Sequence, residues 1–255
     1  MLRQWQIFLY SASIIVFSHV FWDASSISAV QLVALVFRKA ETLGNYAPWD
    51  PFALFGLFAG LISTLVSIES LITLTVIIIA KWSLLGRREP GNYDWDKSSY
   101  CQRWQIFLTI EKMRLRCFQG YGLLGMFTGT AYMVWYFKAL GAEIGKDCAL
   151  FVNGRPSLML TEPDLLTLGD RVTVDDASLV GHINTRGKFD LNRLRVGDRS
   201  VLRTSSRLLS GAEMGADSCL LEHTLIMASD VVDEGVTMQG WPAGRFRASR
   251  VPNCP

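Results

Sequence analysis

A six-residue repeat of aliphatic side chains dominates the last part of this 255-residue chain. Every sixth residue is aliphatic in the series Val196, Leu202, Leu208, Met214, Leu220, Ile226, Val232 and Met238. Most of these are followed, four positions later, by a small or β-branched residue. Because half of the chain is hydrophobic, eight matches in a row would arise by chance only a few times per thousand. A fixed period of six fits neither a helix nor an alternating strand and indicates a solenoid.

The simplest solenoid with this period is a triangular coil in which each hexad forms one short strand and three hexads form one turn. The aliphatic residues then point into the prism, and stacked turns pair their backbones lengthwise. Upstream, Leu168, Val174 and Val180 keep the same phase, and glycine often follows the aliphatic residue, where it would ease the bend. The pattern predicts a parallel coil over residues 141–243. The step from Val180 to Val196 is too long, so we expect residues 183–195 to form the only loop that leaves the coil.

The first third of the chain is apolar and predicts transmembrane helices. Residues 5–22 contain no Asp, Glu, Lys or Arg and carry aromatic side chains at both ends, as a membrane span does. A cleaved signal peptide is the alternative. A retained span is preferred because the apolar core runs into bulky residues instead of a small-residue cleavage site. Residues 51–82 form a second block, read as one long helix in preference to a pair of short ones. Residues 26–39 are too short to span alone and are expected in the membrane interface.

Basic residues end the second apolar block. Lys81 and Trp82 precede Arg87 and Arg88, a combination that marks the cytoplasmic end of a span and predicts that the repeat region lies in the cytosol. Residues 98–118 read as an amphipathic helix resting on protein or lipid headgroups. We therefore divide the chain into a transmembrane region (1–97), an interfacial helical linker (98–140), the repeat domain (141–245) and a tail (246–255).

Charge and cysteine content exclude several classes of protein. The formal net charge is only +2, without a contiguous basic face, so we expect no nucleic-acid partner. The five cysteines are widely spaced and lack a C-x-x-C pair, which predicts reduced thiols, no disulfide framework and no metal site.

Several motifs resemble one known family. They are KWSLLGRREPGNY at the end of the second apolar block, ALGAEIG at 139–145, LLTLGD at 165–170, a histidine before the extruded loop, RVGDRS at 195–200 and MQGWPA at 238–243. In order and spacing they resemble the carboxy-terminal region of nonribosomal peptide synthetase-like proteins of the epsilon-poly-lysine synthetase type. The resemblance covers about residues 51–245. It implies membrane helices followed by an all-β left-handed parallel β-helix of the hexapeptide-repeat acyltransferase kind.

The resemblance also implies a chemistry. In that family the hexapeptide-repeat domains are thought to join carrier-bound aminoacyl thioesters to an amine, so the co-substrate would be the phosphopantetheine thioester of a carrier protein, or acyl-CoA, with no bound cofactor. Neither an adenylation domain nor a carrier motif is recognisable in this sequence, so a carrier or adenylation protein would act in trans. Membrane lipid and a second copy of the chain are the other expected partners.

Three residues are candidates for the site. His182 matches the histidine of the family and could act as a general base, with a structural or vestigial role as the alternative. Trp241 and Pro242 match its closing turn, where they are expected to pack over the end of the coil and could contact the pantetheine arm. Asp175, Asp176 and Asp190 are near His182 in sequence, and the choice of an acid partner among them stays open. His223 lies where a side chain points outward. Two functions follow: a membrane-bound acyltransferase, or a non-catalytic module that anchors and docks a synthetase at the membrane.

Overall fold

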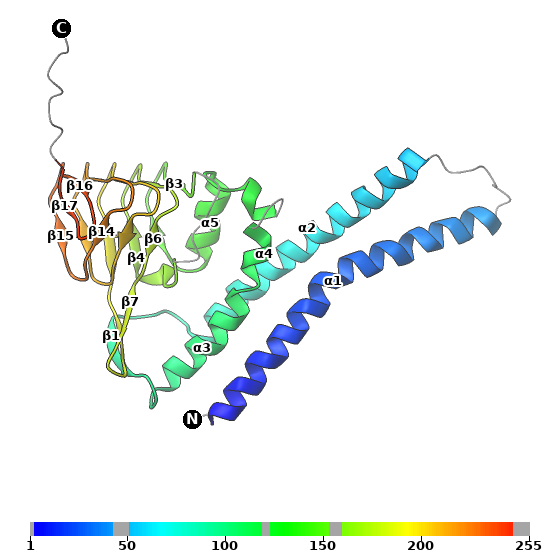
Figure 1. Ribbon diagram of the computed structural model, residues 1–255, viewed down its shortest axis with the longest axis horizontal. Coiled ribbons are helices and arrows are strands. Elements are labelled where there is room, and N and C mark those ends of the chain that lie inside the picture. The colour runs from blue at the N-terminus through cyan, green and yellow to red at the C-terminus, as the bar shows by residue number, and fades with distance from the viewer. Residues whose placement is uncertain (1–2, 43–50, 119–122, 153–159, 247–255) are drawn as a thin grey trace, which may run out of the picture.

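Two long helices and a coil of short strands make up the molecule (Figure 1). The computed structural model describes residues 3–42, 51–118, 123–152 and 160–246. Residues 247–255 of the expected tail, which include Cys254, lie outside the described residues.

The apolar blocks form helix α1 (Gln4–Thr42) and helix α2 (Pro51–Leu84), which pack along each other and extend away from the coil (Figure 1). The prediction of one long helix for residues 51–82 is confirmed. Residues 26–39 are not a separate segment but continue helix α1, in which the hydroxyl of Ser25 donates to the carbonyl of Trp22 at 3.3 Å. One helix therefore runs through both segments. The location of residues 26–39 in the membrane interface stays a prediction.

Both helices are long and apolar enough to cross a membrane by length and composition, and most of each remains uncovered by protein. At the helical rise of 1.5 Å per residue, helices of 39 and 34 residues extend about 58 and 51 Å, more than the ~30 Å of a bilayer core. Large apolar side chains such as Val16, Phe17, Phe52 and Phe55 are more than half exposed. Such a surface is unusual against water and suits lipid or another apolar partner.

The repeat folds into three parallel sheets that the chain visits in turn. The first sheet has the strand order β15-β12-β9-β4-β2, and the third has the order β14-β11-β6. The second has the order β17-β16-β13-β10-β5-β3, in which only the last strand, β17, is antiparallel to its neighbour. The strands are β2 (Glu143–Ile144), β3 (Ala149–Leu150), β4 (Leu166–Leu168), β5 (Thr173–Val174), β6 (Ser178–Leu179), β9 (Leu194–Val196), β10 (Val201–Leu202), β11 (Arg207–Leu208), β12 (Glu213–Met214), β13 (Cys219–Leu220), β14 (Leu225–Ile226), β15 (Val231–Val232), β16 (Thr237–Gln239) and β17 (Gly244–Arg245). One turn of the coil thus contains three strands, as the hexads predict.

Stacked turns pair residues 18 positions apart, which is three hexads. Leu202 lies opposite Leu220, which lies opposite Met238, and Leu208 lies opposite Ile226. The aliphatic residues of the repeat from Val196 to Val232 are buried in one continuous core. The small residues at the corners are buried too, and their hydroxyls bond backbone carbonyls: Ser206 reaches Arg203 at 2.6 Å and Thr224 reaches Leu221 at 2.7 Å.

Glycines follow the aliphatic residue at one corner of the prism because neighbouring turns approach there. A Cβ at Gly197 would lie 2.5 Å from the backbone nitrogen of Ala216, and one at Gly215 would lie 2.6 Å from that of Glu234. Real Cβ contacts are not this short, so the column of glycines lets the turns stack, and their role is close approach instead of an unusual bend.

The sequence register departs from the structure at two places. Leu179, and not Val180, is buried and pairs with Leu208, because the corner at Asp175–Ala177 is one residue shorter than elsewhere. The expectation of a single interruption is also wrong. Ile144 pairs with Leu168 across 24 residues instead of 18, so a second excursion lies between β3 and β4. Within it Leu160 bridges to Leu179 and supplies the missing position of the third sheet.

The predicted extruded loop is a β-hairpin. Strand β7 (His182–Thr185) pairs antiparallel with β8 (Lys188–Leu191), and β8 pairs in turn with β1 (Gly91–Asp94), which follows helix α2. Although most residues of this loop are polar, one side of the hairpin is apolar, and Phe189 and Leu191 on it are fully buried.

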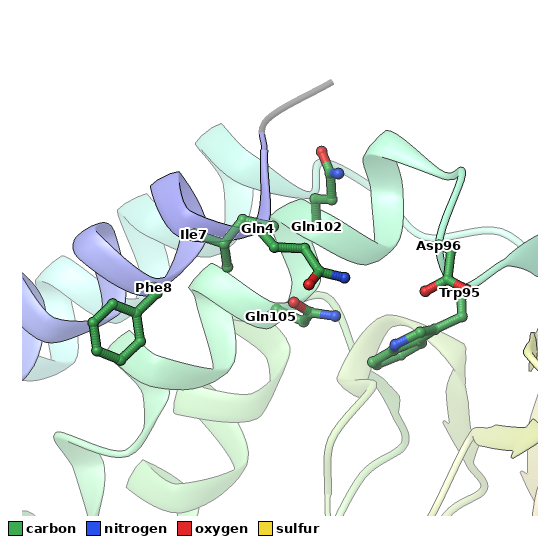
Figure 2. Close-up of a pocket in the computed structure, with 7 residues that line it drawn as sticks. All are labelled: Gln4, Ile7, Phe8, Trp95, Asp96, Gln102 and Gln105. Carbon is green, nitrogen blue, oxygen red and sulfur yellow. The ribbon is translucent and has the colours of Figure 1, made fainter.

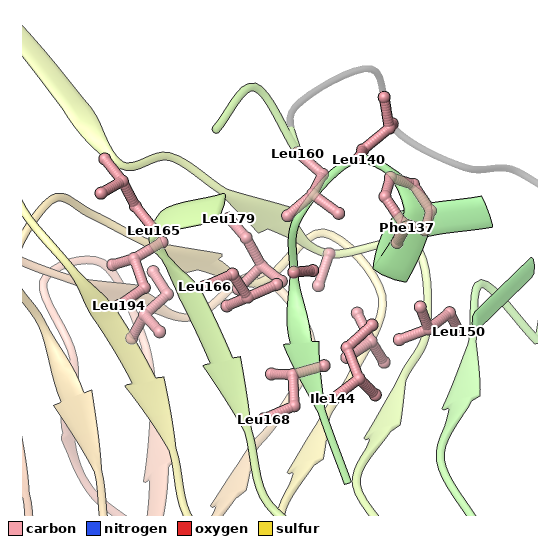
Figure 3. Packing of buried hydrophobic residues seen from close by; sticks show 14 of the residues in the cluster. Phe137, Leu140, Ile144, Leu150, Leu160, Leu165, Leu166, Leu168, Leu179 and Leu194 are labelled. Atoms are coloured by element: carbon pink, nitrogen blue, oxygen red, sulfur yellow. The ribbon is translucent and has the colours of Figure 1, made fainter. Parts of the chain in front are cut away.

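Short helices join the long helices to the coil. Helix α3 (Ser99–Glu111) packs on α1, α2 and β1, and α4 (Arg114–Phe118) packs on α2. The 3-10 turn η1 (Leu123–Met126) leads to α5 (Ala131–Ala139). Phe137 of α5, with Leu140 just after it, lies beside Ile144, Leu150 and Leu160, so this segment closes the first turn of the coil (Figure 3). The segment at 98–118, predicted as one amphipathic helix, is divided into α3 and α4, and both pack on other parts of the protein.

We predict that Leu220→Asp unfolds the coil. Leu220 is completely buried on β13, so the substitution places an unpaired charge inside the prism and should cost at least about 3 kcal/mol. Chemical denaturation of the purified protein measures the loss. Val231→Asp is the matched control, because Val231 lies on strand β15 with 69% of its surface exposed and should change the midpoint little. Equal midpoints for Leu220→Asp and the parent would contradict a core position for Leu220.

Candidate functional site

The two excursions from the coil meet at one corner and bring His182 together with Glu162. His182 opens strand β7, and Glu162 precedes the 3-10 turn η2 (Pro163–Leu165) in the excursion between β3 and β4. Because Leu160 bridges to Leu179 across adjacent turns, the residues that follow each of them are neighbours in space. The Nδ1 atom of His182 lies 2.9 Å from Oε1 of Glu162.

Glu162 is completely buried and fully engaged. Its Oε2 accepts a hydrogen bond from the backbone N–H of Gly181 at 3.0 Å and another from the Thr161 hydroxyl. Burial by itself raises the pKa of this carboxyl, but the hydrogen bond and the charge of His182, then Arg88 and Thr161, outweigh burial and hold the pKa below its usual value. Glu162 is therefore an ionised hydrogen-bond acceptor.

Gly181 leaves the space that this contact requires. A Cβ at position 181 would lie 3.2 Å from both Cβ and Oε2 of Glu162. The Gly181 carbonyl in turn accepts hydrogen bonds from the Ser210 hydroxyl at 2.8 Å and from the backbone of Asn192 at 2.9 Å. The pair of His182 and Glu162, called the dyad below, is thus attached to the coil through Gly181, whose carbonyl bonds to the residue after the hairpin and to Ser210.

Aromatic rings fix the plane of the imidazole. Phe189 of the hairpin stacks on the His182 ring at a centroid distance of 5.2 Å, and Trp104 of α3 meets it edge-on at 5.3 Å. Trp104 also contacts Trp95, whose ring centroid is 5.8 Å away. The imidazole keeps 22% of its surface exposed. With Nδ1 committed to Glu162, Nε2 is the nitrogen that can exchange a proton with a substrate.

A cavity of about 290 Å³ is lined on one side by Trp95 of this aromatic group (Figure 2). Its wall is formed by the first turns of α1, by α3 and by the segment after β1, and its lining residues are Gln4, Ile7, Phe8, Trp95, Asp96, Gln102 and Gln105. His182 is not part of this lining, and Trp95 is the residue that connects the two places through Trp104.

The acid partner of His182 differs from each of the three acids that sequence proximity suggested. Asp175 lies 3.8 Å from the Arg203 side chain, and Asp190 pairs with Ile183 within the hairpin. Asp176 accepts a backbone hydrogen bond from Ser205 through its carbonyl. Glu162 was missed because it is 20 residues from His182 and lies in an excursion that the hexad pattern did not reveal.

Trp241 and Pro242 lie at the far end of the third sheet. The carbonyl of Gly240 and the N–H of Ala243 both bond to Leu225 of β14, so residues 240–243 extend the sheet that begins at β6. The Trp241 ring is 59% exposed and lies 5.3 Å from the guanidinium of Arg207. It lies about three strand spacings, roughly 14 Å, from the strand that precedes His182.

The cations that suggested membrane topology have a different place in the structure. Lys81 and Arg88 are almost completely buried against carboxylates of the η2 segment, whereas Arg87 lies on the surface beside Glu143. The basic cluster is therefore mainly a contact between the long helix and the coil, and the side of the membrane on which the coil lies stays a prediction.

Among the described residues, Cys101, Cys117, Cys148 and Cys219 are free thiols. Burial raises the pKa of the Cys148 and Cys219 thiols, so these two are poor nucleophiles.

The resemblance to poly-amino-acid synthetases is confirmed by comparison with curated proteins. The chain is 23% identical over 172 residues to delta-poly-L-ornithine synthetase of Acinetobacter baumannii (strain AB307-0294). The match covers 66% of this chain and 12% of the synthetase, so the chain corresponds to a small part of that protein. No family model matches the sequence.

Among solved structures, hexapeptide-repeat acetyltransferases are similar to the chain at low identity. A maltose O-acetyltransferase from Clostridium difficile 630 is 11% identical, with a TM-score of 0.38 over 66% of this chain and 96% of its own. A galactoside acetyltransferase in complex with coenzyme A is 11% identical, with a TM-score of 0.36 over 49% and 76%. Serine acetyltransferase of Neisseria gonorrhoeae is 13% identical, with a TM-score of 0.32 over 93% and 97%.

We predict that Glu162 makes stability depend on acid pH. Because its folded-state pKa lies below the unfolded value of about 4.3, ionised Glu162 stabilises the fold above that pH. This contribution is lost as the pH falls through the folded-state pKa. Glu162→Gln should lower the melting temperature at pH 7 and flatten its decline between about pH 5 and 3. Glu234→Gln, at an exposed position, is the control, and an unchanged decline in Glu162→Gln would refute the assignment.

Proposed function

We propose that this chain is a membrane-bound acyltransferase module that transfers an acyl or aminoacyl group from a thioester to an amine or hydroxyl acceptor. The observation that carries the proposal is the dyad of His182 and Glu162, with Nδ1 held by an ionised carboxylate and part of the imidazole exposed. A neutral imidazole oriented in this way is a general base with one defined nitrogen available.

The proposed reaction follows from that geometry. Nε2 of His182 removes the proton of the acceptor while the acceptor nitrogen or oxygen attacks the thioester carbonyl carbon. The carbon–sulfur bond then breaks, a new carbon–nitrogen or carbon–oxygen bond remains, and the imidazolium returns its proton to the sulfur of the leaving group. Glu162 stays ionised throughout and stabilises the imidazolium, which is the role of the acid in other base–acid pairs.

The thioester is proposed to be the phosphopantetheine arm of a carrier protein, with acyl-CoA as the other source of the same arm. Similarity to a poly-ornithine synthetase supports a donor from a nonribosomal peptide synthetase-like pathway of secondary metabolism, supplied in trans by a carrier or adenylation protein. Trp241 and Pro242 are proposed to contact the arm. They lie on the sheet that leads to His182, at a distance that an extended pantetheine chain can cover.

The coil is proposed to be the left-handed parallel β-helix of hexapeptide-repeat transferases, attached to the membrane by α1 and α2 and located in the cytosol. Three strands per turn and residues paired 18 apart support the first part. The exposed apolar surface of the two helices supports the second. A homo-oligomer is compatible with this architecture.

His182→Ala is expected to lower turnover by about 10²- to 10⁴-fold, the usual contribution of a positioned general base. In the assay, the intact, detergent-solubilised protein is mixed with a carrier protein that holds an aminoacyl thioester and with an amine acceptor. The rate at which the thioester disappears is measured. His223→Ala is the control, because His223 is exposed in a turn of the coil.

Equal turnover by the parent and His182→Ala would remove His182 from the mechanism. No turnover by the parent with any carrier of its own gene neighbourhood would favour a non-catalytic anchoring and docking module instead.

Membrane integration predicts that the protein stays in the pellet after alkaline carbonate extraction. Protease added to sealed right-side-out vesicles should then spare the coil, because a cytosolic domain is enclosed in them. A soluble cytosolic enzyme of the host, enclosed in the same vesicles, controls for leakage because it is digested only if the vesicles are open. Release of the chain into the supernatant would contradict integration, and digestion of the coil in sealed vesicles would reverse the topology.

A further inference from the structure

Arg88 lies between two buried carboxylates behind the dyad. Its Nε is 3.1 Å from Oδ1 of Asp164, and its backbone N–H donates to Oδ2 of the same residue at 2.6 Å. Its Nη1 donates to the carbonyl of Thr161 at 2.6 Å and lies 3.7 Å from Oε1 of Glu162. All three charged side chains are completely buried. The atom that Arg88 approaches on Glu162 is the one that also contacts His182.

The end of helix α2 supplies this arginine and a second cation. Lys81, in the last turn of α2, lies 3.0 Å from Oδ2 of Asp164 and is fully buried. The chain turns at Gly86, where φ is +64°, and then places Arg88 under α3, with its guanidinium 5.7 Å from the ring of Phe107. Charged groups thus form a continuous buried series from the long apolar helix to the imidazole.

We propose that Arg88 is a positioning residue for the His182–Glu162 dyad, and that the end of helix α2 is thereby part of the site. The proposal rests on the proposed acyl transfer and deepens it, since Arg88 acts through Glu162 and touches no substrate. The Arg88 side chain donates its hydrogen bond to the carbonyl of Thr161, the residue before Glu162, and attracts the two carboxylates by charge at 3.1 and 3.7 Å. A planar guanidinium can face these three groups in one fixed arrangement, which an ammonium cannot.

The charge of Arg88 also decides how the dyad holds its proton. Without Arg88, the negative charge of Glu162 is compensated less, so a positive imidazolium beside it becomes more favourable. Loss of Arg88 should therefore let the imidazole keep its proton to higher pH than in the parent. The series consists of Lys81, Asp164, Arg88, Glu162 and His182, and the other titratable or charged groups that face it are Arg87, Tyr93, Tyr100, Glu111 and Arg114.

The test compares Arg88→Gln with Arg87→Gln in the intact, detergent-solubilised protein. Arg87 is the matched control, because it is the adjacent cation but pairs with Glu143 on the surface. One readout is the pH profile of kcat/KM with a carrier-bound thioester. The other readout needs no turnover and is the pH midpoint of His182 modification by diethyl pyrocarbonate, which reacts with neutral imidazole and not with imidazolium. Peptide mass spectrometry separates His182 from His19 and His223.

Arg88→Gln is expected to lower kcat about 10²-fold with little change in KM, as misplacement of a catalytic group does. The acid limb of the pH profile and the midpoint of His182 modification should both move up by about one pH unit or more. Arg87→Gln should match the parent in both. An unmoved midpoint in folded Arg88→Gln overturns the proposal, whether or not the parent turns over; a parent without turnover removes only the proposed function.

Arg88→Lys keeps the inference testable where Arg88→Gln does not fold. The lysine preserves the charge, so the midpoint of His182 modification should return to that of the parent. It lacks the planar fork, so kcat should still fall about tenfold. Parent-level kcat in Arg88→Lys, or a midpoint that moves up by about one pH unit, would show that Arg88 does not position the dyad through its charge and geometry.

Discussion

The strands of the coil are two or three residues long, so the backbone groups of each turn find their partners only in the turn before and the turn after. Residues 18 apart must therefore coincide, as Leu202, Leu220 and Met238 do. Any additional residues have to leave the prism between two strands and return at the same corner. This requirement for equal turns accounts for the glycine column, for the buried hydroxyls at the corners and for where the chain can carry anything other than strands.

Both excursions use that freedom, and they do so on consecutive turns. The segment after Leu160 and the segment after Leu179 leave the coil beside each other, so Glu162 and His182 meet although 20 residues separate them. The hairpin adds Phe189, and helix α3 adds Trp104, which together hold the imidazole plane. The site is thus formed by the two segments that lie outside the repeat, and the fixed register of the coil holds these segments side by side.

The long helices take part in the same assembly. Strand β1 follows α2 and pairs with the hairpin, and the end of α2 brings Lys81 and Arg88 against the carboxylates of the η2 segment. Buried charges are costly unless each has a counter-charge, so these contacts are stable only as a complete set. The apolar helices and the coil are therefore joined by a polar contact, and the His182–Glu162 pair lies next to the end of α2.

The sequence by itself determined the coil, because a six-residue period of aliphatic residues such as Leu202, Leu208 and Leu220 is compatible with few other folds. It also predicted one long helix over residues 51–82 and an apolar helix at residues 5–22, and it marked His182 as a candidate base. Only the tertiary structure decided that Leu179 replaces Val180 in the core, that residues 26–39 continue helix α1, and that Glu162 and Arg88 stand behind His182. The physical reason is range. Periodicity reports which side of a local element is buried, whereas the pairing of His182 with Glu162 depends on two excursions of irregular length, and the burial of Arg88 depends on a carboxylate 76 residues away.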